Sequence, residues 1–273
     1  MLSIKETLRA YSLAGKTRTT APALRIFLLG ILAGFIIACG GVAASVASFS
    51  FTSNPSLARL LSALVFPIGL GPVLLTGAEL FTGNCMLPVS VLDKNATLPG
   101  VLRNWLFSAL GNFVGAAGLA LLMAGSGALQ YGDGALAAQV LRQAAAKCSL
   151  LPGNAFLLGV GCNILVCLGV LCGLSAHSVP GRIMGAYLPV FFFVIAGFEH
   201  SVANMYSITV GLLVKALPQY ATVAAVFPAP ALTPGGFARN LLFVMLGNIV
   251  GGGALGLLLW VCHAAPGKTM DKM

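Results

Sequence analysis

The segment IAGFEHSVAN, residues 195–204, places a glutamate and a histidine side by side within a long apolar stretch. YLPVFFFVIAG overlaps its start and MYSITVGLLV follows it, so the two ionisable residues lie well inside an apolar segment. An ionisable group inside a hydrocarbon core costs at least a few kcal/mol, and it usually has a partner or a function there. Glu199 and His200 are therefore the most informative residues of the chain.

The overall composition is that of a membrane protein. The chain has 273 residues, of which 58% are hydrophobic and only 8% are charged. Soluble domains carry roughly 25% charged residues, so a soluble globular protein is excluded. Several charge-free windows reach about 20 residues, the length of a membrane-spanning helix. They do not alternate as the strands of a membrane β-barrel do. The composition predicts an all-α integral membrane protein.

The charged residues predict an orientation. The net charge of +9 comes without a basic run, which argues against nucleic acid as a partner. Cations of the N-terminal segment flank the first span instead, which is typical of a cytoplasmic terminus. Ten Lys and Arg fall on the N-terminal side of the bilayer and five on the other. We therefore expect both termini in the cytoplasm and a multi-pass protein in the plasma or inner membrane.

Six apolar segments can be drawn, at about 24–48, 60–92, 104–125, 153–175, 184–215 and 238–262. The second and fifth are too long for one plain span, which predicts that both are broken near the middle. The predicted organisation is a cytoplasmic N-terminal segment, a six-helix transmembrane domain and a cytoplasmic tail, at 1–23, 24–262 and 263–273.

Three short motifs recur in the same order. GAELFTGN (77–84) matches GFEHSVAN (197–204), LGNFVG (110–115) matches LGNIVG (246–251), and FLLG (27–30) returns at 156–159. Spans one to three therefore resemble spans four to six. Because each unit has an odd number of spans, the two units must be oppositely oriented in the bilayer. The pattern predicts a 3+3 inverted repeat, which is common in channels and transporters.

The two glutamates Glu79 and Glu199 occupy equivalent positions of this repeat, each two residues after a glycine, Gly77 or Gly197. Glycine before the glutamate favours a break in the helix, and unwound backbone in a membrane must line a cavity or be buried in protein. We expect each carboxylate to accept hydrogen bonds from backbone N–H groups freed by the break. Direct binding of a cation by the carboxylates is the alternative.

His200 differs from the glutamates because its counterpart in the first repeat is Leu80, so the fold does not require a histidine. A satisfied core histidine is one interpretation. Its place at the broken midplane favours a functional one, since histidine titrates near neutral pH and can share a proton. We therefore expect Glu199 to shape the break and His200 to face the permeating species.

These motifs carry a resemblance to a known family. GAELFTGN, GFEHSVANMY and LGNIVGGG, supported by KCSLLPGNAFLLGVGCNILVCL (147–168), resemble the formate/nitrite transporter family of formate, nitrite and hydrosulfide channels, over about residues 20–262. The resemblance implies an aquaporin-like protomer in the lipid bilayer, assembled as a homopentamer with one pore per protomer.

The resemblance also implies roles for individual residues. His200 would be the central pore histidine with Thr82 as its hydrogen-bonding neighbour, and Lys147 would add positive potential near the outer mouth. Asn163 and Asn248 would orient the central site. The constrictions would be formed by Phe66 and Phe193 outside and by Leu70 and Leu80 inside, with Val166 and Phe81 close by.

The function implied is passage of small monovalent anions of weak acids, formate first and nitrite or hydrosulfide next, with proton-linked passage at His200. A neutral-solute channel is the main alternative. A membrane enzyme with Glu79, Glu199 and His200 as metal ligands is disfavoured, since the sequence has no H-E-x-x-H and its three histidines are far apart. The seven cysteines form no C-x-x-C pair, so neither a disulfide framework, a metal site nor a cofactor is expected. A purely structural protein would not need duplicated broken helices.

Overall fold

Helices make up all the regular structure of residues 1–263, the part of the chain that the computed structural model describes. Six of them are long and apolar enough to cross a membrane: α2 (Ala23–Ser48), the span from α3 to α4 (Pro55–Thr76), α7 (Leu98–Gly125), α9 (Pro152–Ser175), α10 (Val179–Ala196) and α13 (Pro234–His263). The predicted fold class is confirmed. The predicted tail, 263–273, lies outside the described residues except for His263, the last residue of α13.

The two halves of the chain use the same order of elements. The first half contains α1 (Ile4–Thr20), α2, α3 (Pro55–Val65), η1 (Phe66–Gly69), α4 (Leu70–Thr76), α5 (Phe81–Asn84), α6 (Pro88–Leu92) and α7. After η2 (Ala128–Gln130), the second half contains α8 (Ala135–Ser149), α9, α10, α11 (Ser201–Ala216), η3 (Pro218–Tyr220), α12 (Ala221–Val226) and α13. Thus α8 corresponds to α1, and α11 corresponds to α5 with α6.

Glycines allow close packing of the first and last span within each half. Helix α2 packs along α7, and α9 packs along α13. A Cβ at Gly34 or Gly115 would overlap a backbone carbonyl oxygen of the facing helix, and the same holds at Gly247 and Gly251 in the second half. Without side chains the backbones approach directly, which is how helices commonly associate in membranes.

The predicted breaks are present in both halves. Helices α4 and α10 end at Gly77 and Gly197, which have φ of 65° and 75°. Glycine adopts this left-handed conformation without the steric cost of a Cβ. Three residues of irregular chain follow each glycine, and Leu80 and His200 are the N-caps of α5 and α11.

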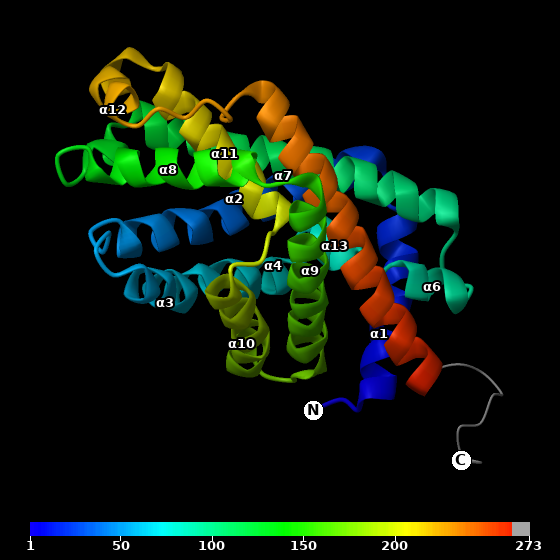
Figure 1. The fold of residues 1–273 in the computed structure, drawn as a ribbon. Coiled ribbons are helices and arrows are strands. Elements are labelled where there is room, and N and C mark those ends of the chain that lie inside the picture. The colour runs from blue at the N-terminus through cyan, green and yellow to red at the C-terminus, as the bar shows by residue number, and fades with distance from the viewer. Residues whose placement is uncertain (264–273) are drawn as a thin grey trace.

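The N-terminal segment is a helix docked on the first break. Ser3 and Glu6 form a capping box that starts α1. The buried Tyr11 donates its hydroxyl to the carbonyl of Gly83, at 2.8 Å. Figure 1 shows α1 and the C-terminal end of α13 at the same end of the molecule, as an even number of spans requires.

Candidate functional site

The carboxylate of Glu79, directly after the first break, is held by side chains from three other elements. Its Oε2 accepts hydrogen bonds from Nδ2 of Asn84, at 2.6 Å, and of Asn104, at 3.1 Å. Its Oε1 lies 3.7 Å from Nε of Arg18. Glu79 is 5% exposed, so this pairing offsets the cost of burying a charge.

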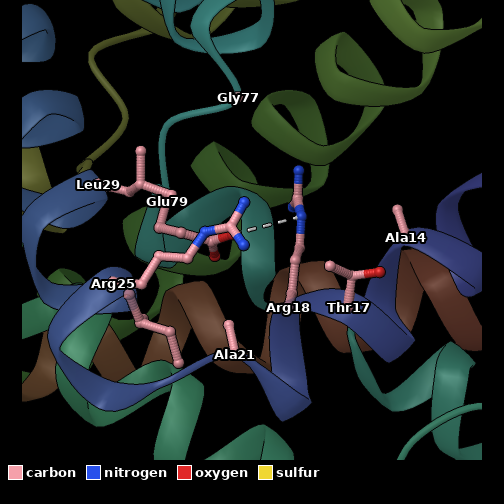
Figure 2. Close-up of a pocket in the computed structure, with 9 residues that line it drawn as sticks. Ala14, Thr17, Arg18, Ala21, Arg25, Leu29, Gly77 and Glu79 are labelled. Atoms are coloured by element: carbon pink, nitrogen blue, oxygen red, sulfur yellow. Dashed lines mark ion pairs between the residues drawn. The ribbon is translucent and has the colours of Figure 1, made fainter.

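Arg18 makes a second contact that fixes the same network. Its guanidinium donates to Oδ1 of Asn84 at 2.7 Å, while its backbone carbonyl accepts from Asn104 at 3.2 Å. Arg18, Arg25 and Glu79 line a cavity of about 330 Å³, the Arg18 cavity, between α1, α2 and the break. Figure 2 shows the ion pair at its wall.

The second half repeats this arrangement at Glu199. Nζ of Lys147 lies 2.8 and 3.0 Å from the two carboxylate oxygens, and Nδ2 of Asn204 donates to Oε2 at 2.6 Å. The same Nδ2 donates to Oδ1 of Asn240 at 2.8 Å, and Asn240 donates to the carbonyl of Lys147 at 2.8 Å. Each half therefore pairs its buried carboxylate with one cation and places two linked asparagines beside it; both donate to Glu79, whereas only Asn204 donates to Glu199.

The prediction that freed backbone N–H groups hold the carboxylates is wrong for both glutamates. Backbone N–H groups at the breaks are already used: those of Glu79 and Glu199 donate to the carbonyls of Leu29 at 3.2 Å and Leu158 at 3.3 Å. Side chains hold the carboxylates instead, and the cation that each binds belongs to the protein.

Asn112 and Asn248 clamp the unwound backbone at the two breaks. Oδ1 of Asn248 accepts from the N–H of Ser201 at 3.0 Å, and Nδ2 donates to the carbonyls of Gly159 at 2.9 Å and Glu199 at 3.1 Å. Asn112 makes the three equivalent bonds in the first half. Backbone groups that lost their helical partners are thus satisfied where water is scarce.

A larger cavity, of about 750 Å³, opens on the Lys147 side and reaches His200. We call it the Lys147 cavity. Arg59, Arg142 and Lys147 line it, and of its lining residues only Glu199 is acidic. Since Glu199 is already paired with Lys147, the cavity carries a net positive charge. Sequence reasoning expected this potential from Lys147 but missed its ion pair and the two arginines.

A hydrogen bond joins the two half-helices that follow the breaks. Oγ1 of Thr82 and Nε2 of His200 are 2.9 Å apart, although the residues are 118 positions apart in sequence. Asn163 supports this contact from α9, donating Nδ2 to the carbonyls of Thr82 at 3.1 Å and Asn248 at 2.6 Å. The structure thus brings together the four residues expected at the central site.

The surroundings of His200 define its neutral tautomer. Its Nδ1 accepts a hydrogen bond from the N–H of Ala203 at 3.0 Å, which caps α11. A ring nitrogen that accepts carries no proton, so the ring proton of neutral His200 is on Nε2 and donates to Thr82. This leaves the hydroxyl hydrogen of Thr82 free to donate to another group. Protonation of the ring would remove the cap.

Apolar side chains surround this polar centre on the side of the Lys147 cavity. The ring of Phe193 stacks on His200 with centroids 5.8 Å apart, and Phe66 meets Phe193 edge-on at 5.8 Å. Both phenylalanines line the end of the Lys147 cavity together with His200. The predicted outer pair is therefore adjacent to the histidine.

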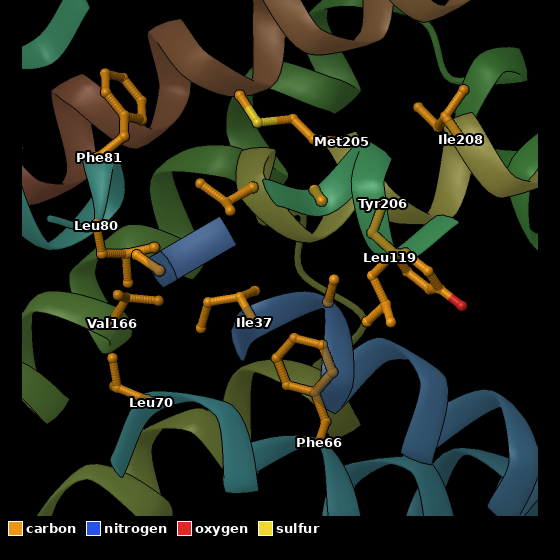
Figure 3. Close-up of a cluster of buried hydrophobic side chains, with 14 of the residues drawn as sticks. Ile37, Phe66, Leu70, Leu80, Phe81, Leu119, Val166, Met205, Tyr206 and Ile208 are labelled. Atoms are coloured by element: carbon orange, nitrogen blue, oxygen red, sulfur yellow. The ribbon is translucent and has the colours of Figure 1, made fainter. Parts of the chain in front are cut away.

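Leu70, Leu80 and Val166, expected at the inner constriction, are buried and lie close together in Figure 3. They belong to one continuous apolar cluster with Phe66. Phe81 points away from these three in Figure 3, and its ring packs against Trp105 at 6.4 Å. The polar centre therefore lies in largely apolar surroundings, with Phe193 stacked directly on His200.

Sequence reasoning missed Arg18 and the asparagine pairs beside the glutamates, Asn84 with Asn104 and Asn204 with Asn240. A signal for two of them was present: RNWLFSALGN (103–112) and RNLLFVMLGN (239–248) share R-N-x-L-F-x-x-L-G-N. This longer repeat includes Asn104 and Asn240 as well as Asn112 and Asn248. Asn84 and Asn204 end the G-x-E-x-x-x-x-N motif, but their role as amide donors appears only in the fold.

An inverted repeat of apolar helices, with two breaks that meet at a polar centre between apolar groups, defines a multi-pass membrane channel or transporter. The chain belongs to the formate/nitrite transporter family, whose family model matches residues 5–262. Its relatives are channels and transporters, and the protein is a transport protein rather than an enzyme.

Individual relatives agree with this assignment. The chain is 37% identical to a probable formate transporter of Methanothermobacter thermautotrophicus, covering 90% of this chain and 91% of the relative. It is 36% identical to the formate channel FocA of Escherichia coli K12, covering 92% and 90%. Among solved structures, a pentameric formate channel with formate bound matches with a TM-score of 0.80 and 33% identity, covering 89% and 98%.

The clamp at the second break predicts a measurable contribution to stability. Asn248→Ala leaves the N–H of Ser201 and the carbonyl of Glu199 at the break without their partner, and each unpaired group costs about 1–3 kcal/mol. We expect a clear fall in the free energy of unfolding, measured by denaturant titration in detergent micelles. Asn154→Ala, at an exposed asparagine of α9, is the matched control and should change stability by less than about 0.5 kcal/mol. Equal effects of the two substitutions would contradict the clamp.

Proposed function

We propose that this protein conducts formate across the plasma or inner membrane and that formate crosses the centre of the pore as neutral formic acid. The observation that carries the proposal is the Thr82–His200 hydrogen bond, a buried polar centre in largely apolar surroundings. Formate leads because the relatives with 36% and 37% identity are named for formate. Nitrite and hydrosulfide share the relevant chemistry, since each is a monovalent anion with a neutral conjugate acid.

The Lys147 cavity supplies the first step, which is attraction of the anion. Arg59, Arg142 and Lys147 line it, and a positive potential in a cleft raises the local concentration of anions. The phenylalanines at its end offer no counter-charge. An anion that moves from the cavity toward His200 therefore leaves a favourable potential and enters an apolar passage.

The apolar passage then favours the neutral acid. Transfer of an isolated carboxylate into apolar surroundings is so costly that the group takes up a proton instead. His200 and Thr82 assist at the centre, because the neutral ring fixes the oxygen of Thr82 and directs its hydroxyl hydrogen toward the permeating molecule. Protonation of His200 removes its cap on α11, so the charge of the ring and the shape of the break are coupled.

The distribution of Lys and Arg and the positions of the two ends of the chain's helices support one orientation of the protein in the membrane. The excess of Lys and Arg on the N-terminal side favours cytoplasmic termini, and α1 lies at the same end of the molecule as the end of α13. With this orientation the Lys147 cavity faces the outside and the Arg18 cavity faces the cytoplasm. Residues 1–23 would then form a cytoplasmic helix beneath the pore.

We further propose a homopentamer with one pore per protomer. The structurally similar formate channel is pentameric, and large apolar side chains on α2, α7 and α13 are exposed in the single chain, as Leu28, Leu121 and Leu258 illustrate. Native mass spectrometry of the protein in mild detergent should give the mass of five chains. A uniform monomer or tetramer would contradict this assembly.

The role of His200 is tested by transport. We expect His200→Asn, in which a good N-cap replaces the titratable ring, to lower formate-driven acidification of liposomes by at least about tenfold, the equivalent of ~1.4 kcal/mol. His177→Asn, at an exposed histidine, is the matched control and should behave as the wild type.

Several outcomes would overturn the proposal. Unchanged flux in His200→Asn across the pH range would mean that the histidine serves the fold alone. Equal rates for formate, nitrite, hydrosulfide and chloride would remove the weak-acid selectivity. Flux of uncharged solutes without any anion-driven signal would indicate a neutral-solute channel instead.

A further inference from the structure

The two halves of the protein carry different cations at the same position of the repeat. Arg18 pairs with Glu79 and also donates to Oδ1 of Asn84 at 2.7 Å. Lys147 directs its ammonium at Glu199 alone, with both carboxylate oxygens within 3.0 Å. A guanidinium is a fork that reaches two acceptors at once, whereas an ammonium is a compact point charge.

This difference leaves one acceptor of the second half without a partner. Oδ1 of Asn204, the equivalent of the Asn84 oxygen that Arg18 binds, has no hydrogen-bond donor, although the residue is 0% exposed. The orientation of the amide is fixed, because its Nδ2 donates to both Glu199 and Asn240. Buried acceptors are nearly always paired in native proteins, so this oxygen points to a ligand.

The unpaired oxygen belongs to a residue beside the Lys147 cavity, whose lining includes Lys147, Glu199, His200 and Asn204. Since Asn204 is fully buried, a ligand reaches its oxygen only when a neighbouring side chain moves. Lys147 is a flexible neighbour, 23% exposed and bound to the same carboxylate as Asn204. Its ammonium has three donors and uses two on Glu199, which leaves one for a ligand.

A protonated carboxylic acid matches this pair of groups. Its O–H can donate to Oδ1 of Asn204, and its carbonyl oxygen can accept the remaining N–H of Lys147. A carboxylate anion has no O–H and can satisfy only Lys147. The pair therefore distinguishes the neutral acid from its anion at a place next to His200.

We infer that Asn204 and Lys147 form a binding site for the neutral form of a small monocarboxylic acid, at the entrance to the central passage. The inference rests on the proposed function, because it assumes that the permeating species is a weak acid. The first half has no equivalent site, since Arg18 already occupies the oxygen of Asn84. The repeat thus supplies a two-fold scaffold with a ligand site in only one half.

A charge-conserving variant tests the site. Lys147→Arg keeps the charge and should fill the oxygen of Asn204 as Arg18 fills that of Asn84. Lys16→Arg makes the same chemical change at an exposed lysine of α1, outside the functional site. We expect Lys147→Arg to raise the KM for formate uptake about tenfold, or ~1.4 kcal/mol, and Lys16→Arg to leave the KM unchanged.

Infrared difference spectroscopy with ¹³C-formate on the protein in nanodiscs, at mildly acidic pH, separates the acid from water as the donor to Asn204. The wild type and Lys16→Arg should show the carbonyl band of bound protonated acid, and Lys147→Arg should lack it. A wild type that transports formate without this band would mean that water fills the site, which overturns the inference and leaves the proposed function standing. A wild type that does not transport formate would overturn the proposed function itself.

Discussion

Two buried carboxylates set the conditions that the rest of this structure must meet. Glu79 and Glu199 each sit one residue before the N-cap of a half-helix, and each is 7% exposed or less. Charges at this depth are tolerated only with a cation and amide donors around them. The positions of α1 and α8, which carry the cations, and of α7 and α13, which carry asparagines, follow from that requirement. The breaks are therefore fixed in place, and their free ends face one another.

The two halves share this framework but differ at two equivalent positions. Leu80 and His200 occupy equivalent N-cap positions, and so do Arg18 and Lys147 beside the carboxylates. In each pair the second half carries the residue with spare hydrogen-bonding or titrating capacity. In the first half, the N-cap is the apolar Leu80 and the oxygen of Asn84 is already bound by Arg18. We attribute the scaffold to what the halves share and the passage of an acid to what they do not.

The sequence predicted more of the fold than of the hydrogen bonds. Apolar length and the repeated G-x-E-x-x-x-x-N motif were enough to predict six spans, the inverted repeat and both breaks. They could not predict that Arg18, in a segment expected only to flank the bilayer, pairs with Glu79. Such a contact joins residues 61 positions apart, from 18 to 79, and depends on how α1 docks. The tautomer of neutral His200 could not be predicted from the sequence either, because it depends on the backbone N–H of Ala203 at the start of α11.

The dependence of formate flux on membrane potential tests the central claim most directly. In liposomes whose potential is set by a potassium gradient and valinomycin, a neutral acid crosses without moving net charge, so the initial rate should not change with potential. A crossing anion would gain or lose about 2.3 kcal/mol per 100 mV, a rate change of up to roughly fifty-fold. A flux that follows the potential would show that formate passes His200 as the bare anion and would contradict this account.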